Sequence, residues 1–119
     1  MSIFALLGII LDSISNGDVI LENNAVCITD IDTISAYVMP LCTDQVGECY
    51  HIIENGRWYQ VVLTFSKDTF CHRGILQSIR FENSEGDAVT CDVAENILNE
   101  LTEKCADEIY FEICDRIMF

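Results

Sequence analysis

Positive charge is the scarcest feature of this sequence. Its 119 residues hold 6 Lys and Arg against 20 Asp and Glu, which gives a formal net charge of -14 at pH 7. No Lys or Arg occurs before Arg57. Because nucleic acids and anionic lipid surfaces are bound through cationic side chains, this composition argues against both as direct partners.

Catalytic and cofactor motifs are missing as well. The sequence contains no glycine-rich phosphate loop, no G-x-S-x-G elbow and no H-E-x-x-H pair. We therefore expect a binding protein rather than an enzyme, and we expect no cofactor.

Long hydrophobic runs are absent too. The apolar opening from Ile3 to Leu11 has the length of a signal-peptide core, but no Lys or Arg precedes it and it leads into Asp12. It is too short to span a bilayer. We expect a cytoplasmic protein without membrane contact.

The seven cysteines lack the spacing of a metal site. None forms a C-x-x-C pair, and neither His51 nor His72 fits zinc-finger spacing, so no structural zinc is expected. Reduced thiols are the simplest account for a cytosolic chain. Cys27, Cys105 and Cys114 fall within apolar patterns, where a free cysteine behaves as a small buried hydrophobe.

One catalytic alternative remains open at Cys71 and His72. A thiol nucleophile needs a histidine that the fold brings close, as His51 would be, and Arg73 would lower the pKa of such a thiol. A small thiol-dependent enzyme is therefore kept as an alternative function.

The first half of the chain predicts a helix followed by a hairpin. Apolar residues recur at helical spacing over 3–15, and Asn16-Gly17 supplies a helix stop. Two β-prone runs, 18–22 and 25–30, are joined by Asn23-Asn24 and should be antiparallel neighbours. Residues 31–47 fit a helix or a strand, and Pro40 is expected to end either one.

The second half predicts a meander, a helix and a final strand. Asn55-Gly56 between two β-rich runs, 50–54 and 57–65, indicates a hairpin with Glu54 opposite Arg57. A third strand is expected from Ile75 to Glu82, and a turn follows over 83–87.

Beyond this turn, Asp92 is a suitable helix N-cap, and Glu95 stands three residues later at the spacing of a capping box. We expect a helix over 92–104. Alternation over 109–119 predicts a strand at the C-terminus. The whole reads as a single α+β domain, residues 1–119, with an antiparallel sheet of about six strands and two or three helices.

The charges are unevenly distributed along the chain. Residues 1–56, 57–80 and 81–119 carry net charges of -8, +3 and -9. On the expected helix, the apolar residues lie on one face and four carboxylates lie opposite: Asp92, Glu95, Glu100 and Glu103. Such a stripe is either an ordinary solvated face or a docking surface for a basic partner. Trp58 and the adjoining Arg57 are further candidates for partner contact, because both residue types are enriched in interface hot spots.

These features predict a small acidic protein inhibitor that covers the cationic cleft of a basic partner, most simply a nuclease toxin. In size and charge the chain resembles the bacterial immunity proteins of contact-dependent growth inhibition and of colicin-type systems, and the resemblance covers composition only. The alternative from the same binding class is a nucleic-acid mimic of phage or viral origin that blocks a defence protein.

Overall fold

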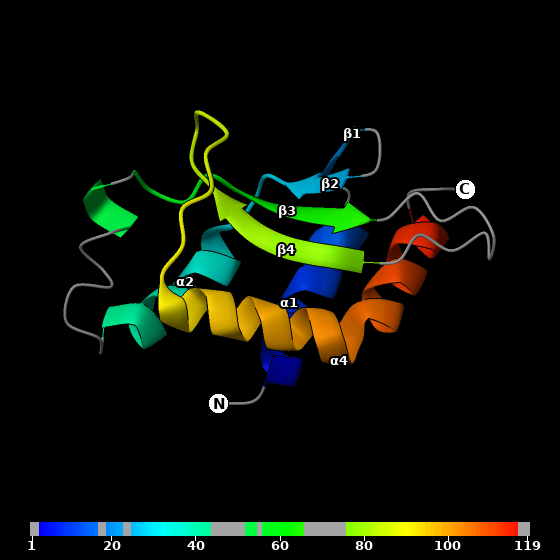
Figure 1. The fold of residues 1–119 in the computed structure, drawn as a ribbon. Coiled ribbons are helices and arrows are strands. Elements are labelled where there is room, and N and C mark those ends of the chain that lie inside the picture. Colours follow the sequence, from blue (N-terminus) through cyan, green and yellow to red (C-terminus); the bar gives the residue numbers. More distant parts are fainter. Residues whose placement is uncertain are drawn as a thin grey trace.

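Four short segments rich in valine and isoleucine form the sheet. The strands β1 (Val19–Glu22), β2 (Ala25–Ile28), β3 (Gln60–Phe65) and β4 (Leu76–Glu82) lie in chain order, and each pair of neighbours is antiparallel (Figure 1). The computed structural model describes residues 3–16, 19–22, 25–43, 52–54, 56–65 and 76–116, without the side chains of 21, 22, 43 and 114–116. Within these residues the expected α+β domain is confirmed, with four strands instead of about six.

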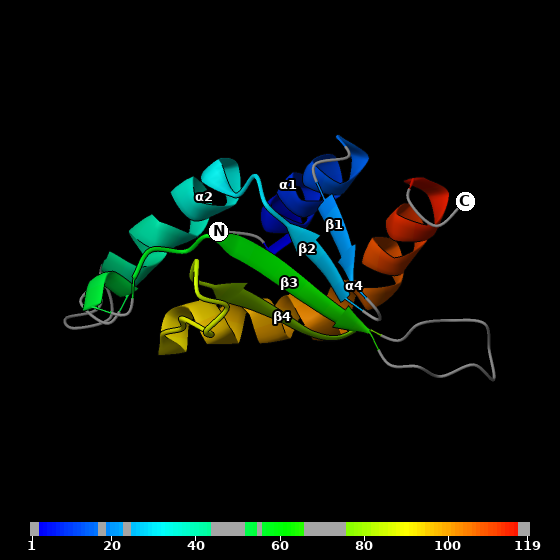
Figure 2. The same ribbon diagram turned by 90° about the horizontal axis from the view of Figure 1, so that it is seen from above.

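Three helices cover one face of the sheet. They are α1 (Ile3–Ser15), α2 (Asp32–Thr43) and α4 (Asp92–Arg116), and α1 packs against both of the others (Figures 1 and 2). A short helical turn over residues 52–54 stands between α2 and β3. No helix in the described part of the chain is long and apolar enough to cross a membrane.

Register decides which strand residues face the helices. The paired residues Val26, Leu63 and Ile79 belong to the core, as do the paired residues Ile28, Val61 and Phe81. Alternate positions point the other way because side chains along a strand alternate between faces. The row Ile20, Cys27, Val62 and Arg80 therefore runs across the face away from the helices.

Helix α1 and the β1–β2 hairpin confirm the sequence prediction. The α1 residues Leu6, Ile10 and Ile14 recur every fourth position and are fully buried. The hairpin pairs Val19 with Ile28 and Glu22 with Ala25. Its Asn23-Asn24 connection and Gly17 lie outside the described residues.

The expectation that Pro40 ends its segment is wrong. Helix α2 continues past Pro40 to Thr43, although proline has no N–H to donate to the carbonyl one turn earlier. The reason lies in the core stripe: Ile34, Val38 and Cys42 recur every fourth residue, and all three are 0 % exposed. Burial of Cys42 favours a further helical turn despite the lost hydrogen bond.

The predicted Asn55-Gly56 hairpin, with its Glu54–Arg57 pair, is also wrong. Residues 52–54 are helical, and β3 begins only at Gln60, with β2 and β4 on its two sides. Gly56 does adopt the positive φ of +93° that its turn chemistry indicates, but its amide N–H closes the helical turn on the carbonyl of Ile53. Burial of Ile52 explains why residues 52–54 form a helical turn and not a strand. The helical turn places this side chain, which is 1 % exposed, in the core.

The largest correction concerns the C-terminal segment, which is helical to Arg116 and forms no strand over 109–116. The isoleucines at 109 and 113 fit a two-residue alternation, but they also continue a helical stripe with Cys105. That stripe keeps contact with the core, whereas Phe111, which the strand pattern would bury beside them, is 51 % exposed. Residues 117–119 lie outside the described residues.

Helix α4 is bent, and its N-cap is one residue earlier than the sequence predicts. Cys105 has non-helical angles (φ -125°, ψ 16°) that join two helical segments. The carbonyl of Cys91 accepts the first helical hydrogen bond from the amide of Glu95, so Cys91 is the N-cap and Asp92 opens the first turn. Asp92 and Glu95 still suit the positive end of the helix dipole there.

Leu101 gives a direct test of the α4 packing. It is 0 % exposed, so Leu101→Ala should lower the free energy of unfolding by about 2–5 kcal/mol through lost burial and a residual cavity. Urea unfolding followed by the fluorescence of Trp58, the one tryptophan in the sequence, measures this. The exposed neighbour Asn99 is the matched control, and Asn99→Ala should change stability by less than about 0.5 kcal/mol. Equal effects of the two substitutions would contradict the orientation of the helix.

Candidate partner-binding surface

Carboxylates line the outer side of α4. Asp92, Glu95 and Glu103 are exposed, as the sequence predicts, and Glu100 is half-buried. The four carboxylates lie on the outer side for one reason. The apolar stripe from Ala94 to Ile113 faces the core, so the remaining positions of the helix face outward.

The acidic surface extends farther than the sequence predicts. Beyond the bend at Cys105 the exposed side chains include Asp107 and Glu108. We use the name α4 acidic surface for Asp92, Glu95, Glu100, Glu103, Asp107 and Glu108. These residues span about 24 Å of helix at 1.5 Å per residue. The sequence reading missed the last two because it assigned 109–119 to a strand and ended the helix at 104.

One cation offsets part of this surface. Lys104 donates a hydrogen bond to Glu100 at 2.9 Å, one helical turn away, and this bond raises the pKa of the Lys104 amino group. Both side chains are about half exposed, so water screens the pair and it contributes little to stability. Glu100 is therefore the least available of the four predicted carboxylates.

Trp58 is not exposed for partner contact. Its side chain is 7 % exposed, and its ring stacks on Phe81 with the centroids 3.9 Å apart and the planes at 12°. The indole Nε1–H donates a hydrogen bond of 3.0 Å to the carbonyl oxygen of Val89. Trp58 thus links the entry to β3 with the segment that leads into α4. Its neighbour Tyr59 is the exposed aromatic of the pair, at 57 %.

Arg57 is exposed but lies in a different place from the α4 acidic surface. It lines a shallow groove of about 460 Å³ together with the 83–89 segment, and the groove contains the carboxylates of Glu54, Glu85 and Asp87. The residues that line it include none from α4. The structure therefore does not bring Arg57 together with the four predicted carboxylates.

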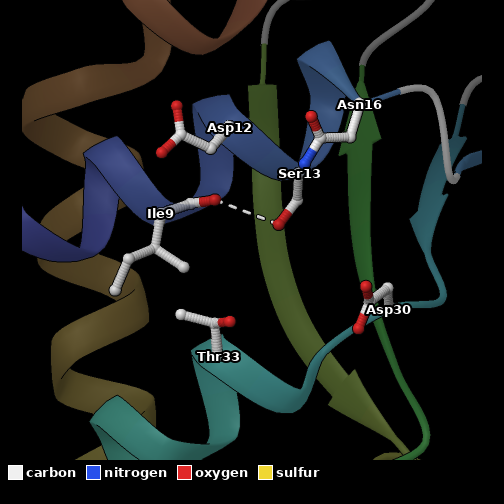
Figure 3. A pocket seen from close by; sticks show the side chains of 6 residues that line it. All are labelled: Ile9, Asp12, Ser13, Asn16, Asp30 and Thr33. Atoms are coloured by element: carbon white, nitrogen blue, oxygen red, sulfur yellow. Dashed lines mark hydrogen bonds between the residues drawn. The ribbon is translucent and has the colours of Figure 1, made fainter.

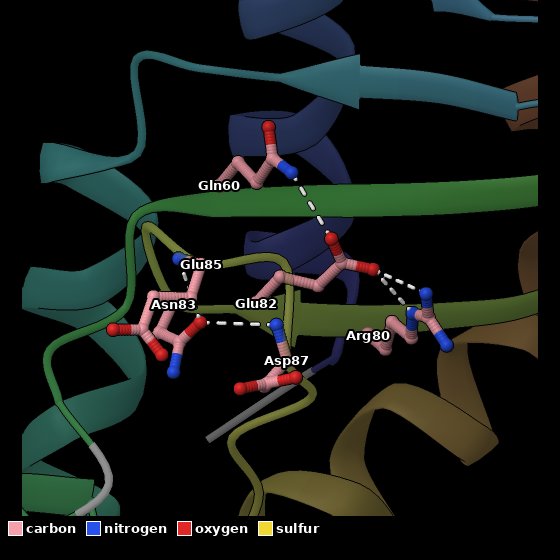
Figure 4. A network of polar contacts seen from close by, with 6 residues as sticks. All are labelled: Gln60, Arg80, Glu82, Asn83, Glu85 and Asp87. Carbon is pink, nitrogen blue, oxygen red and sulfur yellow. Dashed lines mark hydrogen bonds and ion pairs between the residues drawn. The ribbon is translucent and has the colours of Figure 1, made fainter.

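A polar network holds the turn beside this groove (Figure 4). The side-chain oxygen of Asn83 accepts hydrogen bonds from the amides of Glu85 and Asp87, both at 3.0 Å. Gly86 in the same turn has a φ of +84°. The predicted turn over 83–87 is confirmed, and it fixes the two acids at the groove.

Glu82 is a buried carboxylate that no sequence motif distinguishes from the other acidic residues. It is 5 % exposed, accepts a 3.0 Å hydrogen bond from Gln60 and forms an ion pair with Arg80 on its own strand (Figure 4). Its backbone carbonyl also accepts the amide of Tyr59 at 2.8 Å. These contacts are all within the protein and satisfy the buried carboxylate, so Glu82 has a structural role.

A second, smaller pocket lies between α1 and the start of α2 (Figure 3). Its volume is about 230 Å³, and its walls include Asp12, Asp30 and Thr33. Ser13 points toward it, but the hydroxyl donates a 3.0 Å hydrogen bond to the carbonyl of Ile9. Two exposed aspartates with no further ligand set do not define a metal site, and the described residues contain no group of three potential ligands.

The described cysteines are buried and in the reduced, thiol state. Cys27, Cys42, Cys91 and Cys105 are all buried, which confirms the expectation for Cys27 and Cys105. Burial raises the pKa of the Cys105 thiol, and the Glu108 carboxylate adds to the rise. A thiol held in its protonated form is a poor nucleophile. The other thiol hypothesis, Cys71 with His72 and His51, lies outside the described residues.

Known proteins provide no guide to this surface. Comparisons of the chain with protein family models, with characterised proteins and with solved structures find no match.

Trp58 offers a test of its internal role. Trp58→Phe removes the hydrogen bond to Val89 and leaves that buried carbonyl without its donor, so the free energy of unfolding should fall by about 1–3 kcal/mol. Urea unfolding followed by far-UV circular dichroism measures the loss. Tyr59→Phe, on the exposed neighbour, should change stability by less than about 0.5 kcal/mol. A neutral Trp58→Phe would contradict the role of the indole as a link to α4.

Cys105 predicts a loss of stability at alkaline pH. The pKa of this thiol is higher in the folded than in the unfolded protein, so folding favours the protonated thiol. The resulting contribution to the free energy of unfolding is complete below the unfolded pKa. It is lost as pH rises from about 8.5 through the folded pKa. The urea midpoint of the wild type should therefore fall more steeply between about pH 8 and 10 than that of Cys105→Ala. Parallel profiles for the two proteins would count against the assignment.

Proposed function

We propose that this protein is a small acidic inhibitor, an immunity protein that neutralises a basic nuclease toxin by covering its cationic active-site cleft. The observation that carries the proposal is the α4 acidic surface. It places six carboxylates along one helix, and Lys104 is the one lysine among the described residues of that helix.

Electrostatics supports a cationic partner. A nuclease needs a positive cleft to hold phosphates, and a row of carboxylates matches such a cleft in sign. Complementary charge speeds association and disfavours partners of the wrong sign. The net charge of -14 also means that like charges repel one another across the free protein. A cationic partner relieves that repulsion, which favours the complex over the free chain.

Rigidity of the surface supports tight binding. Leu98, Leu101 and Ile109 hold the opposite side of α4 in the core, with exposures of 3 %, 0 % and 0 %. The carboxylates are therefore carried by a backbone that is already ordered before the partner arrives. Less conformational entropy is lost on binding than with a disordered acidic tail.

An aromatic side chain adds apolar contact at one end of the surface. Phe111 is 51 % exposed and follows Asp107 by one helical turn. Interfaces combine a few large aromatic contacts with a charged rim. Phe111 thus takes the role that the sequence suggested for Trp58.

A nucleic-acid mimic is the second candidate, and the length of the α4 acidic surface favours it. The carboxylates continue past the bend to Glu108, and a mimic needs an extended negative row. The two candidates share one binding surface and differ in the class of the partner. A mimic occupies a DNA-binding protein that does not cleave nucleic acid, whereas an immunity protein abolishes a nuclease activity.

The test begins with capture of a cationic protein on the immobilised chain at low salt and its release at high salt. The released protein, made in pure form, should cleave DNA or RNA and should lose this activity on addition of one equivalent of the inhibitor. Retention of a DNA-binding protein without nuclease activity would support the mimic instead. Absence of any retained basic protein would rule out both.

Paired variants then locate the binding surface on α4. Glu95→Gln with Glu103→Gln removes two exposed charges of the α4 acidic surface and changes the net charge from -14 to -12. Association with the captured protein should slow by about tenfold at low salt, with a smaller change at high salt. Stopped-flow kinetics at several ionic strengths measures this.

The matched control removes the same charge elsewhere. Asp12→Asn with Asp30→Asn also leaves a net charge of -12, at exposed positions in α1 and in the segment before α2 (Figure 3). Its association rate should stay within about twofold of the wild type. Equal slowing by both pairs would show that total charge, and not the α4 acidic surface, governs binding.

A further inference from the structure

Two cysteines far apart in the sequence meet inside the fold. The Sγ atoms of Cys42 and Cys91 lie 3.2 Å apart, although 49 positions separate the residues. Cys42 is 0 % exposed and Cys91 is 6 % exposed. Both are in the reduced, thiol state. Neither residue has a part in the inhibitor function proposed above.

The fold positions each thiol through a separate element. Cys42 continues the buried stripe of α2 after Ile34 and Val38. Cys91 is the N-cap of α4, and its carbonyl is held by the amide of Glu95 at 2.9 Å. Two residues earlier, Val89 is fixed by the indole of Trp58 and by its own hydrogen bond to the carbonyl of Phe81. Neither side of the contact depends on a long unsupported loop.

The separation of the sulfurs is suited to bond formation. A disulfide has an S–S distance of about 2.05 Å, so the two sulfurs must approach by roughly 1 Å from their contact at 3.2 Å. Helices α2 and α4 already pack together.

We propose that Cys42 and Cys91 are an oxidation site, a dithiol that hydrogen peroxide converts to an intramolecular disulfide. The sulfur of the Cys91 thiol, the more accessible of the two, attacks one peroxide oxygen and the O–O bond breaks. The thiol proton passes to the departing hydroxide, which gives a sulfenic acid and one water. Cys42 then attacks that sulfur, the S–O bond breaks, and the oxygen leaves as a second water. Two thiols thus lose two electrons and two protons, and one peroxide becomes two waters.

The disulfide links α2 to the start of α4 and closes a loop that contains β3 and β4. A cross-link of this span restricts the unfolded chain and stabilises the folded one, so the urea midpoint should rise by about 1 M or more. The oxidised protein keeps the α4 acidic surface, because Cys91 precedes it and contributes no carboxylate.

The experiment uses the reduced full-length chain, treated briefly with one equivalent of hydrogen peroxide under native conditions. Remaining thiols are then blocked with N-ethylmaleimide, and non-reducing peptide mass spectrometry locates the bonds. The expected product is a Cys42–Cys91 linked peptide, together with the rise in urea midpoint, and both are reversed by dithiothreitol. Recovery of Cys42 and Cys91 as blocked thiols, while peroxide has oxidised other cysteines, would overturn the proposal.

Matched alanine variants assign the stability effect. Cys42→Ala and Cys91→Ala should each abolish the peroxide-induced rise in midpoint, whereas Cys27→Ala should retain it. Cys27 is a suitable control because it is also buried but lies on the other face of the sheet. A rise that persists in Cys42→Ala would assign the effect to another pair. The peptide map of the wild type decides the question even where a variant fails to fold.

Discussion

The structure depends on the need to cover one apolar face of a four-stranded sheet. Leu63, Phe81 and their paired neighbours face inward from the strands, and burial of such side chains contributes about 1.5–3 kcal/mol each. One long helix and two shorter ones provide the cover. Since α4 gives its whole apolar stripe to this task, its charged residues are left on the outside. The acidic surface is thus a consequence of the packing as well as of the composition.

The contact of Trp58 with Phe81 and Val89 connects the two layers. It joins the entry to β3, the second half of β4 and the segment before α4 at a single buried position. The turn over 83–87 and the first turn of α4 are both attached to this position within a few residues. Conformational order in the sheet therefore extends to the helix that carries the carboxylates. Large aromatic side chains beside a turn can serve such an internal role as readily as a role in recognition.

Sequence patterns predicted the elements whose local preferences agree with the tertiary contacts. Helix α1, the β1–β2 hairpin, strand β4, the 83–87 turn and the helix from Asp92 are of this kind. The errors occur where two periods fit the same residues: Ile109 and Ile113 suit both a strand and a helix, and the burial of Cys105 decides for the helix. Pro40 and Asn55-Gly56 carry strong local signals, but the burial of Cys42 and Ile52 outweighs them.

Among the candidate site residues, the exposure of Asp92, Glu95 and Glu103 followed from helix periodicity, whereas the position of Trp58 did not. A single sequence does not tell which of the two adjacent aromatics before β3 faces inward, because that choice depends on their contacts with β4. The thiol pair was likewise beyond sequence reasoning. Contact between residues 49 positions apart depends on how α2 and α4 pack, and no local pattern encodes it.

The open edge of the sheet has a consequence for colloidal behaviour. Among the described strands β1 is terminal and has one neighbour, and Ile20 on it is 50 % exposed. Unpaired strand edges promote association between copies, and charge repulsion at neutral pH opposes such association. Around the pI of 4.1 the net charge of the chain is zero, and this barrier disappears. The same acidity that suits a cationic partner therefore also keeps the free chains apart in neutral solution.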